Sequence, residues 1–195
     1  MSVEATLRSL LANEKYVELL LKDQYHPDFI EDFRDCNRYA VHPLTVDTSK
    51  FTIALQLFYD GMGTTNPLRG QSSLCSVGVF YYTVKNLPTV FNSCFANVNL
   101  LALGYYHDVK VYGFEAILEK FVSEIKNLSS RWFNGNFPII GSRQIYVTMF
   151  QVAGDNLALN GILGFIESFS CDFFAPCVTQ LNPRYKLNFV RRISP

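Results

Sequence analysis

Charged residues are scarce in this chain of 195 residues, and neither sign dominates. Lysine and arginine together number 17, as do aspartate and glutamate, so charged residues make up only 17% and the formal net charge is zero. A typical globular protein has about 25% charged residues. The chain therefore has no overall positive field that would draw it to nucleic acid, and such binding would need a local basic patch. Four basic residues follow the last acid and fit either a weak patch or a solvated tail: Arg184, Lys186, Arg191 and Arg192.

The chain also lacks the apolar runs that mark a signal peptide or a membrane span. Residues 1–23 are amphipathic and carry several charges, unlike a signal peptide, and no run of about 18 uncharged apolar residues occurs. The five cysteines are odd in number and widely scattered, so we expect free thiols in a reducing intracellular compartment. Hydrophobic residues make up 49% of the sequence and aromatic residues 15%, which is enough for the sizeable core of one domain, with or without an extension.

Hydrophobic periodicity predicts an α/β domain. Segments with apolar residues at helical spacing are expected to form helices, the first of them capped by Ser2: 3–21, 113–128 and 156–169. Short apolar segments, most of them rich in β-branched and aromatic residues, are expected to form strands: 51–59, 73–84, 98–105 and 144–152. Residues 25–50 and 131–141 are expected to be irregular.

Two of the predicted strands end in an aspartate followed by turn residues. Asp60 precedes Gly61, and Asp155 precedes Asn156. Three strands with short links, then a helix, then a parallel fourth strand, is the order of ribonuclease-H-like domains, in which the first and fourth strands are neighbours. Asp60 and Asp155 would then face each other at one edge of the mixed sheet. Two such carboxylates are the minimal cage for Mg²⁺ acting on phosphate esters.

Two other groups of residues have both a structural and a functional interpretation. The three histidines are dispersed without ligand spacing and are expected at the surface or the rim: His26, His42 and His107. Phe80, Tyr81 and Tyr82 could stack bases on an exposed sheet face. Alternation in a strand that is buried on both sides explains these three aromatic residues better.

Several segments resemble a family of animal transposable-element-derived proteins. They are FYDGMGTTNPLRG at 58–70, HDVKVYGFEAILEKFVSEIKNL at 107–128, GDNLALNGILGFIESF at 154–169 and EDFRDCNRYAVHPL at 31–44. The resemblance covers nearly the whole chain, from about residue 7 to residue 177. It implies a ribonuclease-H-like transposase core of the DDE kind, in which paired acidic side chains hold two Mg²⁺ ions for the cleavage and joining of DNA strands.

The resemblance assigns roles to the two aspartates. Asp60 matches the first aspartate of the family's acidic pair, and Asp155 matches the aspartate of its Asp-Asn-Leu motif, which implies that both are catalytic residues and metal ligands. The interpretation without a metal is that the two aspartates cap turns and helix starts.

The chain also departs from the family pattern. Gly61 and Gly63 stand where the family has a second aspartate and a glutamate, and Asn160 stands where it has a histidine. Cys171 and Cys177 match a closely spaced pair but have five residues between them, which makes a poor zinc half-site. The chain stops before the helical region in which such transposases present a third acid.

These observations together predict a catalytically degenerate, transposase-derived protein. It would act, if at all, as a nuclear interaction module for nucleic acid or protein, without a membrane, and as a homo-oligomer or with another protein. The alternatives are a Mg²⁺-dependent DNA nuclease or transposase that uses Asp60 and Asp155, and a decayed reading frame without a function. We expect an N-terminal helix and irregular extension at 1–50, a truncated ribonuclease-H-like core at 51–170 and a tail at 171–195.

Overall fold

The computed structural model of the protein describes residues 2–22, 33–47, 49–63, 76–91 and 94–154, together with Leu159, Gly161 and Ile162. The helices are α1 (Val3–Leu11), α2 (Glu14–Leu21), α3 (Asn37–Ala40), α4 (Pro43–Val46) and α5 (Tyr106–Arg131). Short 3-10 turns occur at Phe33–Asp35, Thr89–Phe91 and Phe95–Asn97. The strands are β1 (Phe51–Gly63), β2 (Ser76–Val84), β3 (Asn99–Tyr105), β4 (Phe133–Phe137) and β5 (Gly141–Ala153). The predicted α/β class is confirmed.

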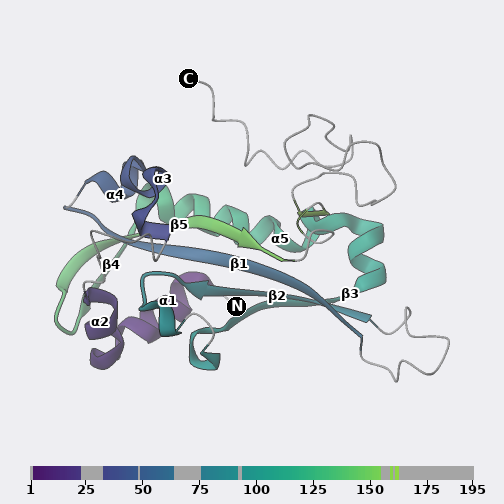
Figure 1. The fold of residues 1–195 in the computed structure, drawn as a ribbon, viewed down its shortest axis with the longest axis horizontal. Coiled ribbons are helices and arrows are strands. Elements are labelled where there is room, and N and C mark those ends of the chain that lie inside the picture. Colours follow the sequence, from purple (N-terminus) through teal and green to yellow (C-terminus); the bar gives the residue numbers. More distant parts are fainter. Residues whose placement is uncertain are drawn as a thin grey trace. The chain divides into compact units, whose positions relative to one another are not determined.

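The five strands form one mixed sheet in the order β3-β2-β1-β5-β4 (Figure 1). The sheet has antiparallel neighbours and one parallel pair. β5 runs in the same direction as β1 in Figure 1, and the long helix α5 precedes β5 in the chain. A parallel connection needs such a crossover, because a tight turn can join only antiparallel strands. The first predicted strand therefore does neighbour the fourth, as the sequence indicated.

The strand β4 was not predicted, and the expectation of an irregular segment at 131–141 is wrong. Phe133 and Phe137 are buried while Asn134 and Asn136 are exposed, so the segment alternates with the period of a strand. β4 pairs antiparallel with β5, Phe133 lying opposite Ile145. Asparagine, glycine and proline, which favour turns, make up five of the eleven residues at 131–141 and hid the strand.

The predicted N-terminal helix is two helices. Ser2 caps α1 as expected, its Oγ accepting a hydrogen bond from the N–H of Ala5 at 3.4 Å. The chain then leaves the helix at Ala12, and Asn13 caps α2 by accepting a hydrogen bond from the N–H of Tyr16 at 3.3 Å. Asparagine favours caps over helix interiors, because its amide competes for backbone partners. The segment predicted to be irregular also contains the short helices α3 and α4.

Helix α5 begins earlier than predicted and is interrupted at Gly113. That residue has φ 80° and ψ 164°, so two helical stretches meet there. Only glycine adopts this conformation without strain, since it has no Cβ. The sequence pattern placed the start of the helix at Gly113. In the structure, Gly113 instead lies between two helical stretches, one before it and a longer one after it.

The chain divides into two compact units, each built from three stretches of sequence. One unit contains Met1–Gln56, Tyr82–Asn99 and Lys120–Gln151, and the other contains Leu57–Tyr81, Leu100–Glu119 and Val152–Pro195.

Helix α1 is attached to the rest of the first unit through its N-terminus. The Glu124 carboxylate accepts hydrogen bonds from the Ser2 hydroxyl at 2.5 Å and from the N–H of Glu4 at 3.0 Å. Burial acts to raise the pKa of the Glu124 carboxyl, but these hydrogen bonds outweigh it and hold the pKa below its usual value.

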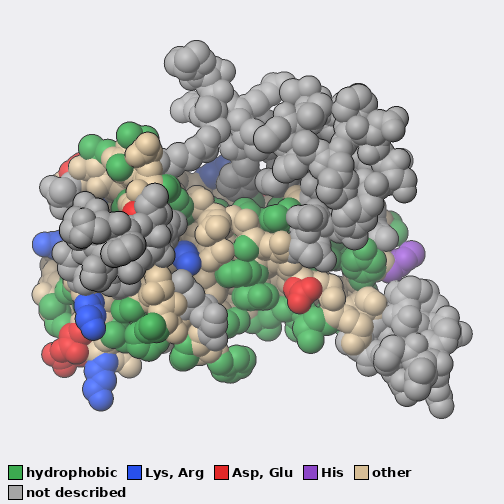
Figure 2. All heavy atoms as spheres, viewed as in Figure 1, with side chains coloured by type: hydrophobic (Ala, Val, Ile, Leu, Met, Phe, Trp, Pro, Cys, Tyr) green, Lys and Arg blue, Asp and Glu red, His purple; other side chains and the backbone are tan. Residues whose placement is uncertain are grey.

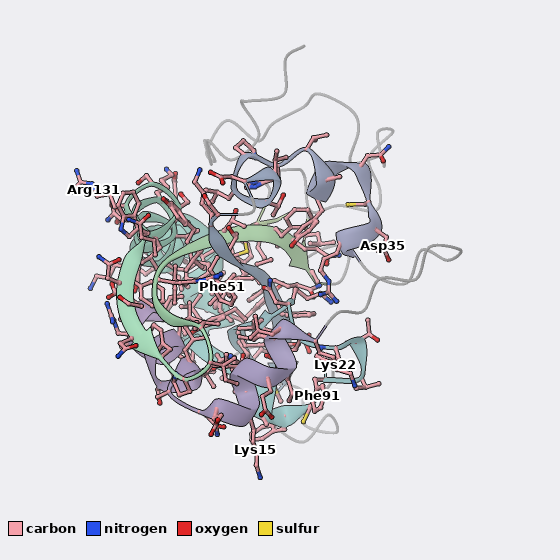
Figure 3. All side chains as sticks on the ribbon, turned by 90° about the vertical axis from the view of Figure 1, so that its left-hand side faces the viewer. Lys15, Lys22, Asp35, Phe51, Phe91 and Arg131 are labelled. Atoms are coloured by element: carbon pink, nitrogen blue, oxygen red, sulfur yellow. The ribbon has the colours of Figure 1, made fainter. Side chains whose placement is uncertain are left out.

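Figure 3 shows side chains crowded near Phe51 at the start of β1, with Lys15 and Arg131 at the periphery.

The core of the second unit is an aromatic cluster. The Tyr59 ring lies 4.6 Å from the Phe80 ring and 4.9 Å from the Phe114 ring, measured between centroids. Phe80 is fully buried, and Tyr81, on the opposite face of β2, stacks on Phe58 at 4.9 Å. The aromatic residues of β2 therefore pack against other aromatic rings on both faces of the strand, which agrees with their interpretation as core residues.

Candidate functional site

Asp60 lies inside β1, so the expectation that the strand ends at this aspartate, with turn residues directly after it, is wrong. The strand continues through Gly63, so the aspartate is three residues from the end of the strand rather than at it. Gly61 and Gly63 do not have positive φ, so the two glycines are as extended as any strand residue. The Asp60 side chain is exposed, whereas its neighbour Tyr59 is 4% exposed.

The two faces of β1 separate Asp60 from the glycines that follow it. Side chains alternate along a strand, so Asp60 shares a face with Phe58 and Met62, while positions 61 and 63 share the face of Tyr59. Positions two apart on one face are about 7 Å apart, within reach of a common ion for flexible acidic side chains. An acidic pair at 61 and 63 would therefore form on the opposite face from Asp60.

The backbone leaves room for side chains at both glycines. A Cβ atom built on Gly61 or on Gly63 meets no other atom within 4 Å. Neither the local conformation nor the packing demands glycine here. A carboxylate at either position is sterically compatible with the fold.

Asp155, the predicted partner of Asp60, lies outside the described residues. β5 ends at Ala153, two positions before it, and β5 is the neighbour of β1 in the sheet. The predicted pairing of the two carboxylates and their Mg²⁺ ion therefore stays a prediction. Asn160, Cys171, Cys177 and the basic tail also lie outside the described residues.

The described residues contain no group of three or more His, Cys, Asp or Glu side chains placed to hold a metal ion. Cys36 and Cys94 are free thiols, half-buried and exposed respectively. In the described part of the chain, no helix has both the length and the apolar character needed to cross a bilayer. Asp60 is thus the one predicted site residue that the structure positions, as a solvated carboxylate on β1.

His42 has a structural role at the start of α4. Its Nδ1 atom accepts a hydrogen bond from the N–H of Leu44 at 3.2 Å, which caps the helix. The ring packs edge-on against Phe150, with 6.2 Å between centroids. Burial lowers the pKa of the His42 imidazole, because the charged form is desolvated.

Acidification is expected to weaken this helix cap. The pKa of His42 is lower in the folded than in the unfolded chain, so its stabilising effect is complete above about pH 6.5 and is lost as the pH falls below that value. Urea unfolding between pH 7.5 and about pH 5 should show the loss, and His42→Asn, which keeps an acceptor at the N-cap, should reduce the pH dependence. An unchanged pH dependence in His42→Asn would contradict the assignment.

Two features of the surface and the core were not predicted from the sequence. One is the exposed apolar side of the edge strand β3, where Leu103 and Tyr105 are 60% and 63% exposed. The other is the buried amide of Asn97, which is 3% exposed. The exposed apolar side of β3 could have been predicted, because no charged residue occurs between residues 96 and 106. The burial of the Asn97 amide could not, because it depends on tertiary contacts.

Figure 2 shows many hydrophobic and few charged side chains on the face in view.

No protein-family model matches the chain, and no curated protein matches it.

Proposed function

We propose that this chain is a transposase-derived, ribonuclease-H-like domain that has lost strand-transfer chemistry and works as a nuclear interaction module, with protein as its main partner. The single observation that carries the proposal concerns the end of β1. Positions 61 and 63 have room for larger side chains but hold glycine, and Asp60 is the acidic residue beside them. The local fold accommodates acidic side chains there, so their absence reflects the sequence and not a steric conflict.

The order of the sheet supports the ancestry. The predicted arrangement has three antiparallel strands, then a helix, then a strand that lies beside the first. The order β3-β2-β1-β5 agrees with it. β4 is an addition at the outer side of β5 that the ribonuclease-H-like pattern does not require. Fold alone does not carry activity, so the functional part of the proposal depends on the residues of β1.

The low charge of the chain favours a protein partner over DNA. A formal net charge of zero gives no long-range attraction to phosphates, which supplies most of the affinity of non-specific DNA binding. Exposed apolar side chains are instead typical of surfaces that contact other proteins. DNA binding by the local basic tail remains the alternative, together with a Mg²⁺-dependent nuclease that uses Asp60 and Asp155.

Restoring the acids provides the experiment. We expect wild-type protein to cleave no labelled DNA duplex with Mg²⁺ or Mn²⁺, and the double variant Gly61→Asp/Gly63→Glu to bind Mn²⁺ at least about tenfold more tightly than wild type, because affinity rises with the number of carboxylate ligands. Isothermal titration calorimetry measures the affinity.

The matched control is Gly61→Ala/Gly63→Ala, which adds Cβ atoms without charge and should leave Mn²⁺ affinity unchanged. Metal-dependent cleavage by the wild type that disappears in Asp60→Ala and in Asp155→Ala would overturn the proposal in favour of the nuclease. Wild-type Mn²⁺ affinity equal to that of the acidic variant would also contradict the loss of the site.

A further inference from the structure

The two edges of the sheet are protected differently. At β4, the guanidinium of Arg8 donates a hydrogen bond to the backbone carbonyl of Asn134 at 2.7 Å. A charged side chain therefore already uses a backbone acceptor of that edge strand. At β3, no further strand of the described chain pairs on the side away from β2. An edge strand with free N–H and C=O groups is a template for another strand, and proteins usually block it with charge, proline or a bulge.

β3 has none of the usual blocking residues. Its sequence, Asn-Leu-Leu-Ala-Leu-Gly-Tyr, contains no charged residue and no proline over seven residues. Three of its large apolar side chains are substantially exposed: Leu100 at 48%, Leu103 at 60% and Tyr105 at 63%. The strand therefore offers both backbone hydrogen bonds and apolar area to a partner in extended conformation.

The same strand is complementary to itself. In an antiparallel pair centred on Ala102, each Leu101 lies opposite a Leu103, and each Asn99 lies opposite a Tyr105. No charged pair occurs in this register, and cross-strand pairs of apolar residues are stabilising. A twofold axis through Ala102 produces a closed, isologous contact, which is the commonest symmetry among homo-oligomers.

The charge of the whole chain does not oppose the approach of a second copy. Its formal net charge is zero at pH 7, so two copies approach each other without long-range repulsion. A partner of one strong charge sign would gain nothing from β3 itself, which is uncharged.

We propose that β3 pairs antiparallel with β3 of a second copy of this chain, which joins two sheets across a twofold axis. This inference rests on the proposed interaction function and names its partner. The pairing satisfies backbone groups at the edge and covers Leu103 and Tyr105, which are exposed in the single chain.

Sedimentation of the full chain over a concentration series tests the pairing. Wild type should reach a mass twice the 22.2 kDa of one chain. Leu103→Lys should raise the dimer dissociation constant by at least about tenfold, because it places a charge in an apolar cross-strand pair. The control is Val46→Lys on α4, where the valine is 59% exposed against 60% for Leu103, and it should dimerise like wild type.

Hydrogen exchange supplies a second measurement that needs no variant. The amides of β3 should exchange more slowly at high than at low protein concentration, while those of α2 should not change. A wild type that stays monomeric throughout, or equal dissociation constants for the two lysine variants, would overturn the pairing. A monomer without nuclease activity that binds another protein overturns only the pairing, whereas metal-dependent DNA cleavage overturns only the proposed function.

Discussion

Phe80→Ala is expected to lower the free energy of unfolding by about 4 kcal/mol, since it removes a large buried ring and leaves a cavity. Phe80 is fully buried, and its ring lies 4.6 Å from that of Tyr59 and 6.0 Å from that of Phe114. Pairs of aromatic rings at these separations contribute beyond the area they bury. Thermal unfolding followed by circular dichroism should show a Tm lower by about 10 °C.

The matched control for Phe80 is the same substitution at Phe95, which is 90% exposed. Phe95→Ala should change the free energy of unfolding by no more than about 0.5 kcal/mol. If the two variants lost equal stability, Phe80 would not belong to the core of its unit, and the aromatic cluster would have to be reassigned.

Asn97→Ala is expected to lower the free energy of unfolding by about 3 kcal/mol, because it leaves buried backbone groups without partners. The Asn97 amide accepts a hydrogen bond from the N–H of Val84 at 3.1 Å and donates to the carbonyls of Val84 and Phe91, at 3.2 and 3.4 Å. The side chain thus acts as a strand partner at the end of β2. Urea unfolding measures the change.

Two further variants test whether the hydrogen bonds of the Asn97 side-chain amide account for this loss of stability. Asn97→Asp keeps an acceptor but loses both donated bonds, so it should not recover the stability that alanine removes. Asn136→Ala, at an exposed position of β4, should be nearly neutral. Full stability in Asn97→Asp would show that the donated bonds contribute little.

The elements that the sequence predicted correctly are those whose own residues determine them. β1, β2 and β5 are rich in β-branched and aromatic residues, and β3 is a short apolar run between turn residues, so these patterns are visible without knowing what the strands contact. β4 was missed because only its two phenylalanines carry the alternation, and its pairing with β5 supplies the remaining stabilisation. The break between α1 and α2 was readable in Asn13, whose preference for caps outweighs the continuous apolar face.

The candidate site was predictable in part. The sequence placed Asp60 in an apolar strand, as the structure does, but the expected turn after it assumed that two glycines end a strand. Gly61 and Gly63 stay extended, because glycine permits a turn without requiring one. Buried amides such as Asn97 could not be predicted, since their partners come from a loop and a strand end that meet only in the fold.

The division into two units has a consequence for how this gene can be altered. Each unit draws on three separate stretches of the chain, and β1, β2 and α5 contribute residues to both. No contiguous fragment therefore contains one complete unit without also containing residues of the other. Deleting β1, β2 or α5 would remove residues of both units, whereas a point substitution changes one unit alone.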